Sequence, residues 1–443
     1  MFRILNSIFI LLLFSCLLSA QDVPDFRQVD IETYRFYEAG QWDSLIELGE
    51  PALDNGIDYF YLRMRLGIAR YEKRNYIKSS QHFRHALEFN NVDPVALEYL
   101  YYAYLLSGKV NQANFVAKQF PESLKQKTGI IPKPVDKVDA SFFYSRSATD
   151  DIVNNSIDYF PTDVLGYQVV TKYFSNFNIS LRHYFGSRFS LNHAYTHLYK
   201  VNFNYLNNGT YIIKNPDIVV KQHQYYISIN SAFAGGWNLA PAFHIVHTRY
   251  PVITSITQGG PGRPPSTQYT GQKETSLLAG LMVTKSLGYI DLRLYGHGSN
   301  LNNNKQAQGA VGLTWYPFGN LDLYVGGDFI VLLQPQDRAS GVNPIGNGMV
   351  GFSIARKVWF EFTTAVGEMQ NYAEGNGYLV YNSADILSQK YNLNISVLVT
   401  DRGSLIFAGA RYSSYASYLT SLIDPELTEL NELNYNNLSI YGG

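Results

Sequence analysis

The chain has 443 residues, of which 16% are charged and 15% aromatic, with 36 tyrosines and a formal net charge of -1. This charge excludes the basic face that a nucleic-acid partner requires. No apolar run of about 18 residues follows the first 20 positions, so a helical membrane protein is excluded, whereas a β-barrel uses only every second residue toward lipid and is not. The single cysteine is Cys16, so the rest of the chain has no disulfide framework, cysteine metal site or thiol nucleophile.

Residues 1–20 have the features of a secretory signal peptide. Arg3 precedes an apolar run over residues 4–18, and Leu18-Ser19-Ala20 then predicts cleavage after Ala20. The alternative is a lipoprotein box at residues 13–16, which would leave a lipidated Cys16. In both cases we expect the mature protein to leave the cytoplasm.

A repeat with a period of 34 residues occupies residues 26–127. Three sets of residues recur at this spacing: Gly40, Arg74 and Gly108; Trp42, Tyr76 and Val110; and Ala52, Ala86 and Phe120. A 34-residue period of paired helices resembles the tetratricopeptide repeat (TPR). We therefore expect an all-α solenoid of three repeats.

In such a stack the first helix of each repeat lines a concave surface. Two equivalent positions on that helix hold Tyr34, Ile68 and Tyr102, and, one turn away, Tyr37, Tyr71 and Leu105. The candidate binding residues are therefore Tyr34, Tyr37, Tyr71 and Tyr102, which would bind a periplasmic protein or a glycan. The alternative is that these rings pack between adjacent repeats.

Residues 128–136 are Pro-rich and lack a helical period, which predicts a short stiff linker. Residues 137–443 then follow the period-2 pattern of strands. The longest example is 173–203, where two arms on either side of Gly186-Ser187-Arg188 each exceed the ~9–11 residues of a tilted membrane-spanning strand.

Tight turns alternate with longer polar connections, including 251–272 and 368–388. Outer-membrane barrels show this asymmetry between periplasmic turns and extracellular loops. Three of the four tryptophans, Trp237, Trp315 and Trp359, lie near the expected short turns, as in an interfacial aromatic girdle, unless bulky residues simply cap the strand ends. The pattern predicts an α+β multidomain chain, with the solenoid followed by an antiparallel transmembrane β-barrel of about 14 strands (12–16).

The barrel half resembles the YaiO family in two segments, LRHYFGSRFSL (residues 181–191) and GWNLAPAF (residues 236–243). The order of signal peptide, TPR stack and barrel also resembles Gram-negative envelope proteins that export exopolysaccharide. In those relatives the repeats dock periplasmic partners and the barrel is the exit pore. This chain departs from them in having three repeats instead of a long superhelix.

The sequence contains no recognisable catalytic motif and implies no cofactor. His193 and His197 share one strand face but are about 13 Å apart, too far for a common metal ion. His183, His244 and His247 leave an outer-membrane lipid hydrolase as a less favoured alternative. The Gly-Pro-rich segment 259–265 predicts an extracellular loop, either mobile or folded inward as a constriction.

Polar residues on the strands are expected to face the lumen, where they would set selectivity, bind a polar solute, or pair and plug the pore. The lumen candidates are Arg182, Asp291, Arg293, Asp322, Asp328 and Glu361, together with His297. We expect a barrel in the outer membrane, surrounded by lipid, that acts as a conduit for a polysaccharide or another polar solute, with the repeats in the periplasm. The alternative is a non-conducting, membrane-anchored interaction scaffold.

Overall fold

The computed structural model describes residues 25–130, 134–148, 165–185, 189–207, 209, 212–214, 217–257, 266–334, 341–383, 385–400, 404–418, 420–421 and 432–443. The expected signal peptide and the segment 259–265 lie outside these residues. Two compact units are present. Within the described residues, the first contains the helices up to residue 106 together with residues 119–129, and the second contains residues 107–118 and the strands from residue 134 onward.

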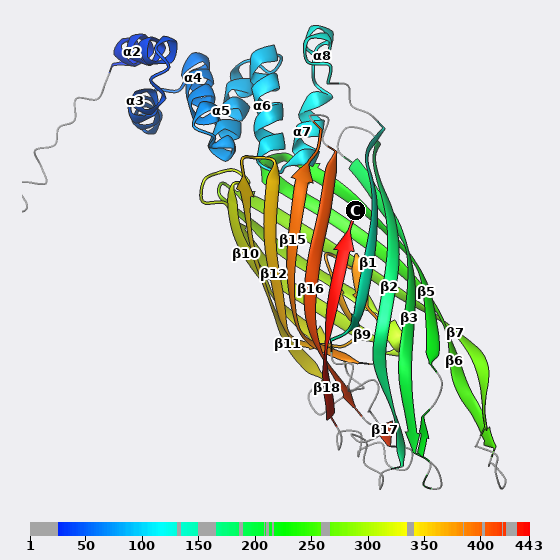
Figure 1. Cartoon of the computed structure of the whole chain (residues 1–443). Coiled ribbons are helices and arrows are strands. Elements are labelled where there is room, and N and C mark those ends of the chain that lie inside the picture. The colour runs from blue at the N-terminus through cyan, green and yellow to red at the C-terminus, as the bar shows by residue number, and fades with distance from the viewer. Residues whose placement is uncertain are drawn as a thin grey trace, which may run out of the picture. The chain divides into compact units, whose positions relative to one another are not determined.

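The N-terminal part consists of helices that follow one another in pairs (Figure 1). In the described residues these are α2 (Phe26–Glu38), α3 (Trp42–Asp54), α4 (Phe60–Glu72), α5 (Tyr76–Phe89), α6 (Pro94–Leu106), α7 (Val110–Ala117) and α8 (Glu122–Thr128). The helices α2, α4 and α6 begin at residues 26, 60 and 94, and α3, α5 and α7 at residues 42, 76 and 110. The 34-residue period and the three predicted repeats are confirmed.

The same turn joins the two helices of each repeat. Gly40 and Gly108 have φ of +64° and +78°, and Arg74 adopts the equivalent conformation at +62°. Glycine fits this left-handed position without strain, which explains its recurrence at the helix end. A second glycine of this repeat, Gly67 of α4, lies against the Phe83 ring of α5. A Cβ atom on residue 67 would come within 2.9 Å of that ring. The close approach of these two helices therefore depends on glycine.

None of the helices in the described part of the chain is long and apolar enough to cross a membrane.

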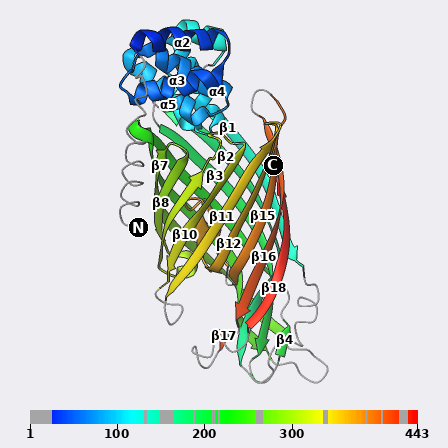
Figure 2. The same cartoon turned by 90° about the vertical axis from the view of Figure 1, so that its left-hand side faces the viewer.

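Fourteen long strands in the described residues form one closed antiparallel barrel (Figures 1 and 2). They are β1 (Val135–Ser147), β2 (Gly166–Phe185), β3 (Phe189–Asn207), β5 (Ile218–Phe233), β6 (Trp237–Thr257), β7 (Ser266–Leu287), β8 (Ile290–Ser299), β9 (Gln306–Trp315), β10 (Leu323–Leu333), β11 (Val342–Ile354), β12 (Val358–Met369), β15 (Ile386–Leu398), β16 (Leu405–Tyr418) and β18 (Glu432–Gly442). Pairing of β18 with both β16 and β1 closes the barrel. The prediction of about fourteen strands is confirmed.

Four short strands complete the sheets of the described residues. β4 (Ile212–Lys214) pairs with β3, and β17 (Thr420–Ser421) pairs with β2. β13 (Tyr372–Glu374) and β14 (Leu379–Tyr381) form a separate two-stranded sheet. The prediction of a long connection over 251–272 is wrong about its length. The strands continue into this segment, since β6 runs to Thr257 and β7 begins at Ser266.

Side chains alternate between the two faces of the barrel wall. On β8, Leu292 and Leu294 are 41% and 63% exposed, whereas Arg293 between them forms an ion pair with Asp328 of β10. On β9, Val311 and Leu313 are exposed and Ala310 is buried. A closed barrel has one face toward its lumen and one outward, so the exposed apolar residues form its outer surface.

Candidate functional site in the barrel lumen

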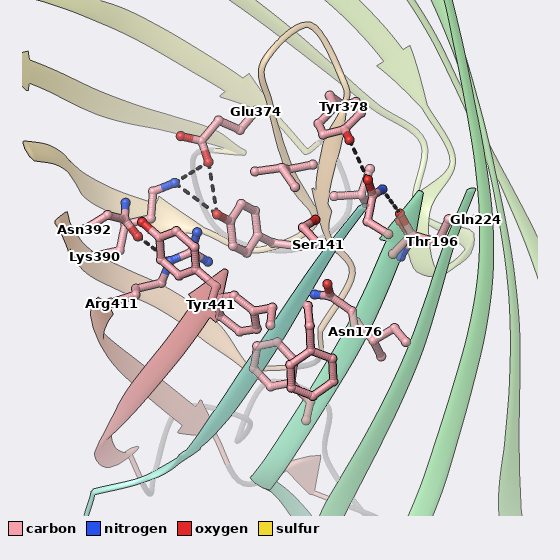
Figure 3. A pocket seen from close by; sticks show the side chains of 18 of the residues that line it. Ser141, Asn176, Thr196, Gln224, Glu374, Tyr378, Lys390, Asn392, Arg411 and Tyr441 are labelled. Atoms are coloured by element: carbon pink, nitrogen blue, oxygen red, sulfur yellow. Dashed lines mark hydrogen bonds and ion pairs between the residues drawn. The ribbon is translucent and has the colours of Figure 1, made fainter. Parts of the chain in front are cut away.

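A hairpin inside the lumen connects β12 to β15. Residues 370–383 contain β13, a turn and β14, and the hairpin is visible within the barrel in Figure 3. Gly375, Asn376 and Gly377 in the turn have φ of +61°, +57° and +82°, a conformation that favours glycine and asparagine. The chain therefore reverses tightly at the tip of this hairpin, which we call the lumen hairpin.

Side chains from one part of the wall bind the backbone of the lumen hairpin. Gln308 of β9 donates from Nε2 to the carbonyl of Ala373 at 2.8 Å and accepts from the Ala373 amide at 3.3 Å. Gln306, two residues earlier, donates to the carbonyl of Asn371, and Gln334 donates to that of Gln370. These bonds satisfy backbone groups that would otherwise be buried without partners.

Strands elsewhere in the wall hold the tip of the hairpin. On β6, the ring of His244 donates from Nδ1 to the Gly377 carbonyl at 2.7 Å, and the Ala240 carbonyl accepts from Asn376 Nδ2 at 2.8 Å. Tyr378 donates from its hydroxyl to Asn178 Oδ1 of β2 at 3.0 Å. Since β2, β6 and β9 lie at separate positions around the barrel, the lumen hairpin crosses its interior.

An ion pair fixes the hairpin to a further strand. Lys390 of β15 pairs with Glu374, and the two side chains are 2% and 25% exposed. Tyr381 donates from its hydroxyl to Glu374 Oε2 and accepts from Lys390 Nζ, both at 3.0 Å. The three side chains form one hydrogen-bonded group, of which Glu374 and Lys390 are labelled in Figure 3.

A cavity of about 960 Å³ lies beside the lumen hairpin. Its lining combines amides and hydroxyls with aromatic rings, among them Asn176, Asn178, Thr196, Gln224, Phe174 and Tyr441. Figure 3 shows Asn176, Thr196, Gln224 and Tyr441 on the wall strands around the cavity, together with Glu374 and Tyr378 of the hairpin. Amides and hydroxyls give hydrogen bonds and rings give apolar contact, so the lining is suited to a polar solute such as a sugar.

Arg411 of β16 is a charged residue of this lining. Its Nε donates to Asn392 Oδ1, and its guanidinium lies 4.9 Å from the centre of the Phe143 ring. Among the ion pairs found between described residues, none involves Arg411. The guanidinium therefore adds positive charge to a part of the lining that also contains the Glu374 carboxylate.

The six lumen candidates do not form one site. Glu361 lines the large cavity and accepts from Tyr324 at 2.7 Å. The ion pair between Arg293 and Asp328 is 2.9 Å long, and Asp322 accepts from Ser353 Oγ at 2.9 Å. The remaining two, Arg182 and Asp291, line a separate pocket of about 220 Å³.

Sequence reasoning missed the lumen hairpin and its partners Lys390 and Arg411. Residues 368–388 were expected to be an extracellular connection, and that expectation is wrong because wall side chains hold this segment inside the barrel. A signal was present, since Gly375-Asn376-Gly377 separates Tyr372-Ala373-Glu374 from Tyr378-Leu379-Val380-Tyr381, and aromatic residues on both sides of such a turn are typical of a β-hairpin. It could not show on which side of the wall the hairpin lies.

The four tyrosines proposed for the repeats differ in their surroundings. Tyr34 is exposed and donates to Glu38, and Tyr37 packs at 6.1 Å against the Trp42 ring of the same repeat. Tyr71 contacts the rings of Tyr76 and Tyr99, the latter on the next repeat, and Tyr102 contacts Tyr101. Tyr71 thus packs between repeats, while Tyr34 faces solvent.

The repeats contain a titratable cluster that makes the stability of this unit depend on pH. His82 Nε2 lies 3.6 Å from Glu50 Oε1, and Arg70 pairs with the same carboxylate at 2.7 Å. His82, and then Arg70, lower the pKa of Glu50 from its usual 4.5 to about 2. Burial lowers the pKa of His82 below its usual 6.5.

Both folded-state pKa values are depressed, so both groups stabilise the repeats above their unfolded pKa values and lose this effect as the pH falls. We expect the amide protection of α3–α5 to decrease first below pH 6.5 and again below pH 4.5. Hydrogen exchange of the full chain between pH 7 and 3 measures this. Glu50→Gln should reduce the second decrease, to which Asp58 also contributes because Arg63 lowers its pKa. A profile that is unchanged by the substitution would contradict the assignment.

No family model matches the sequence, and neither does any curated protein sequence. Among solved structures, MamA of MSR-1 is 16% identical and the match covers 24% of this chain, with a TM-score of 0.21. The chain spans 59% of the length of that MamA chain.

Barrel structures match the remaining part. A FadL homologue of Pseudomonas aeruginosa is 9% identical, covering 69% of this chain and 90% of that one, with a TM-score of 0.38. A bacterial polysaccharide outer-membrane secretin is 7% identical, covering 69% and 97%, with a TM-score of 0.30.

Proposed function

We propose that this protein is an outer-membrane barrel that conducts a polar solute, and that the lumen hairpin is its constriction. The repeats lie in the periplasm in this proposal and dock a protein partner or a glycan, for which the exposed ring of Tyr34, 5.2 Å from the Arg65 guanidinium, offers a surface. We also propose that the barrel is related to YaiO proteins, which residues 181–191 and 236–243 resemble.

The outer surface of the barrel supports its insertion in a membrane. On β3 we measure the height of the outer surface from Phe189, at the short-turn end, to Tyr199. These positions are ten residues apart, which corresponds to a rise of about 33 Å along the strand. A tilt of about 40° reduces this to about 25 Å, the height of the apolar band of such barrels. At the short-turn ends of the strands Trp237, Trp315 and Phe318 are about half exposed, which suits aromatic rings at an interface.

The single observation that carries the conduit proposal is the cavity, lined by amides, hydroxyls and rings, beside a tethered hairpin. The hairpin has strands of only three residues each and is held by hydrogen bonds to wall side chains, by the Glu374–Lys390 ion pair and by the buried Tyr372 ring. Such a segment can move without unfolding the wall. The same tethering supports the second candidate function, a plugged barrel that anchors the repeats, so conductance must distinguish them.

The proposal is tested in planar lipid bilayers with the full chain and two matched double variants. Gln306→Ala/Gln308→Ala removes three hydrogen bonds to the hairpin. Gln268→Ala/Gln272→Ala removes two exposed glutamines of β7 that lie outside the cavity lining. We expect wild type and the second variant to form channels of equal conductance, and the first variant to conduct more. No channel with any of the three proteins would favour the anchor.

A further inference from the structure

Three basic residues lie side by side on the outer surface of the barrel. Lys221 of β5 is directly opposite Arg249 of β6, which is directly opposite Lys273 of β7. Side chains at such positions have Cβ atoms about 5 Å apart. All three are exposed, and none of the ion pairs between described residues includes them. Adjacent like charges destabilise a sheet, so this basic row is expected to have an anionic partner from outside the chain.

The next row toward the turns is polar as well. His197, His223 and His247 are aligned across β3, β5 and β6. The rings of His197 and His223 are 4.8 Å apart, and Arg249 Nε lies 3.4 Å from His247 Nε2. Polar groups on the outside of a barrel are costly within hydrocarbon. These two rows therefore mark the level at which the apolar surface ends.

The distance from the short turns gives the depth of the basic row. Tyr199 is opposite Lys221 and Phe189 is opposite Ser231, so the row lies ten residues beyond the turn end of the wall. As calculated above, this corresponds to about 25 Å along the membrane normal. Between the two levels the outward side chains include the apolar, exposed Ile229, Phe243 and Leu281. The outward His193 in this band is hydrogen-bonded to the Tyr225 hydroxyl, so its polar ring has a partner there. The basic row thus lies at the interface farther from the short turns.

We propose that Lys221, Arg249 and Lys273 bind the phosphate groups of a lipid headgroup in the leaflet at that interface. The guanidinium supplies two parallel donors and each ammonium a compact charge, a combination that fits clustered phosphate oxygens. The position of the row favours a lipid as the ligand, since the apolar surface between the row and the short turns would contact the acyl chains of the same lipid. The inference rests on the proposed insertion in a membrane, but it does not depend on conduction through the lumen.

The test is native mass spectrometry of the full chain in detergent, titrated with phosphatidylglycerol, with phosphatidylcholine or with inorganic phosphate. Each basic residue near an anionic lipid surface contributes a factor of about five, so Lys221→Gln/Arg249→Gln/Lys273→Gln should weaken phosphatidylglycerol binding about 100-fold. Lys285→Gln is the matched control. Lys285 is an outward basic residue at the turn end, where its Nζ donates to the Gly235 carbonyl at 2.7 Å, and its loss should leave binding unchanged.

The outcomes separate the sources of the phosphate. Equal binding by wild type and the triple variant, or equal binding of phosphatidylcholine and phosphatidylglycerol by wild type, would overturn the proposal. Displacement of phosphatidylglycerol by millimolar inorganic phosphate would assign the row to a free anion and overturn it as well. Heat-modifiable electrophoretic mobility shows whether each variant is folded, and the single variant Arg249→Gln provides a second test if the triple variant fails to fold.

Discussion

Replacement of residues 370–383 by a short Gly-Ser connection is expected to raise the single-channel conductance several-fold. The lumen hairpin crosses the interior between β6, β9 and β15 and fills part of the cross-section through which a solute would pass. Met369 and Leu387 already pair across β12 and β15, so a connection of roughly four residues can join the two strands. The wall should therefore remain closed.

The measurement is conductance in planar bilayers, with uptake of sugars of graded size into proteoliposomes as a second readout. The variant should admit larger sugars than wild type does. A folded variant with the conductance and size limit of wild type would contradict the role of the hairpin as the constriction. Heat-modifiable mobility serves as the control for folding.

Glu374→Ala is expected to release the lumen hairpin from the wall. The Lys390 side chain is only 2% exposed, and removal of its partner leaves a buried charge unpaired. Breaking such a pair costs about 3–5 kcal/mol. We expect the hairpin to detach locally while the wall stays folded, because the hairpin strands are short and the wall strands are held by pairing with each other. Hydrogen exchange at residues 372–381 should therefore accelerate by more than a factor of 100.

Two further variants make the test specific. Glu374→Ala/Lys390→Met removes both charges and should recover much of the protection. Lys137→Met changes a lumen lysine that is 55% exposed and pairs with Asp139, and it should leave the exchange of the hairpin unchanged. If Glu374→Ala exchanged at the wild-type rate, the ion pair would not be a main tether.

Periodic parts of the fold could be predicted from the sequence. Gly40 and Gly108 mark the same turn in two repeats, and the alternation around residues 173–203 is that of β2 and β3. Such signals are local, since they depend on residues within a few turns or one strand. The length of each strand at its loop end was less well predicted, because polar residues continue β6 and β7 beyond the apolar band.

The candidate site could not be predicted because distant segments form it. Glu374 and Lys390 meet only when the connection folds inward, which local sequence does not determine. Lys221, Arg249 and Lys273 are 28 and 24 residues apart along the chain, and strand register alone aligns them. Arg293 and Asp328 were each expected in the lumen, but their ion pair depends on the register of β8, β9 and β10.

Insertion of the barrel in a membrane requires lipid at its outer face, and β9 offers the most direct measurement of that contact. Since Cys16 is the only cysteine, Cys16→Ser allows single cysteines with a fluorescent label at Ala310, Val311, Leu313 and Thr314 in vesicles containing brominated lipid. We predict strong quenching at Val311 and Leu313, whose side chains are exposed, and weak quenching at the inward Ala310 and Thr314. Equal or reversed quenching at these positions would contradict the account.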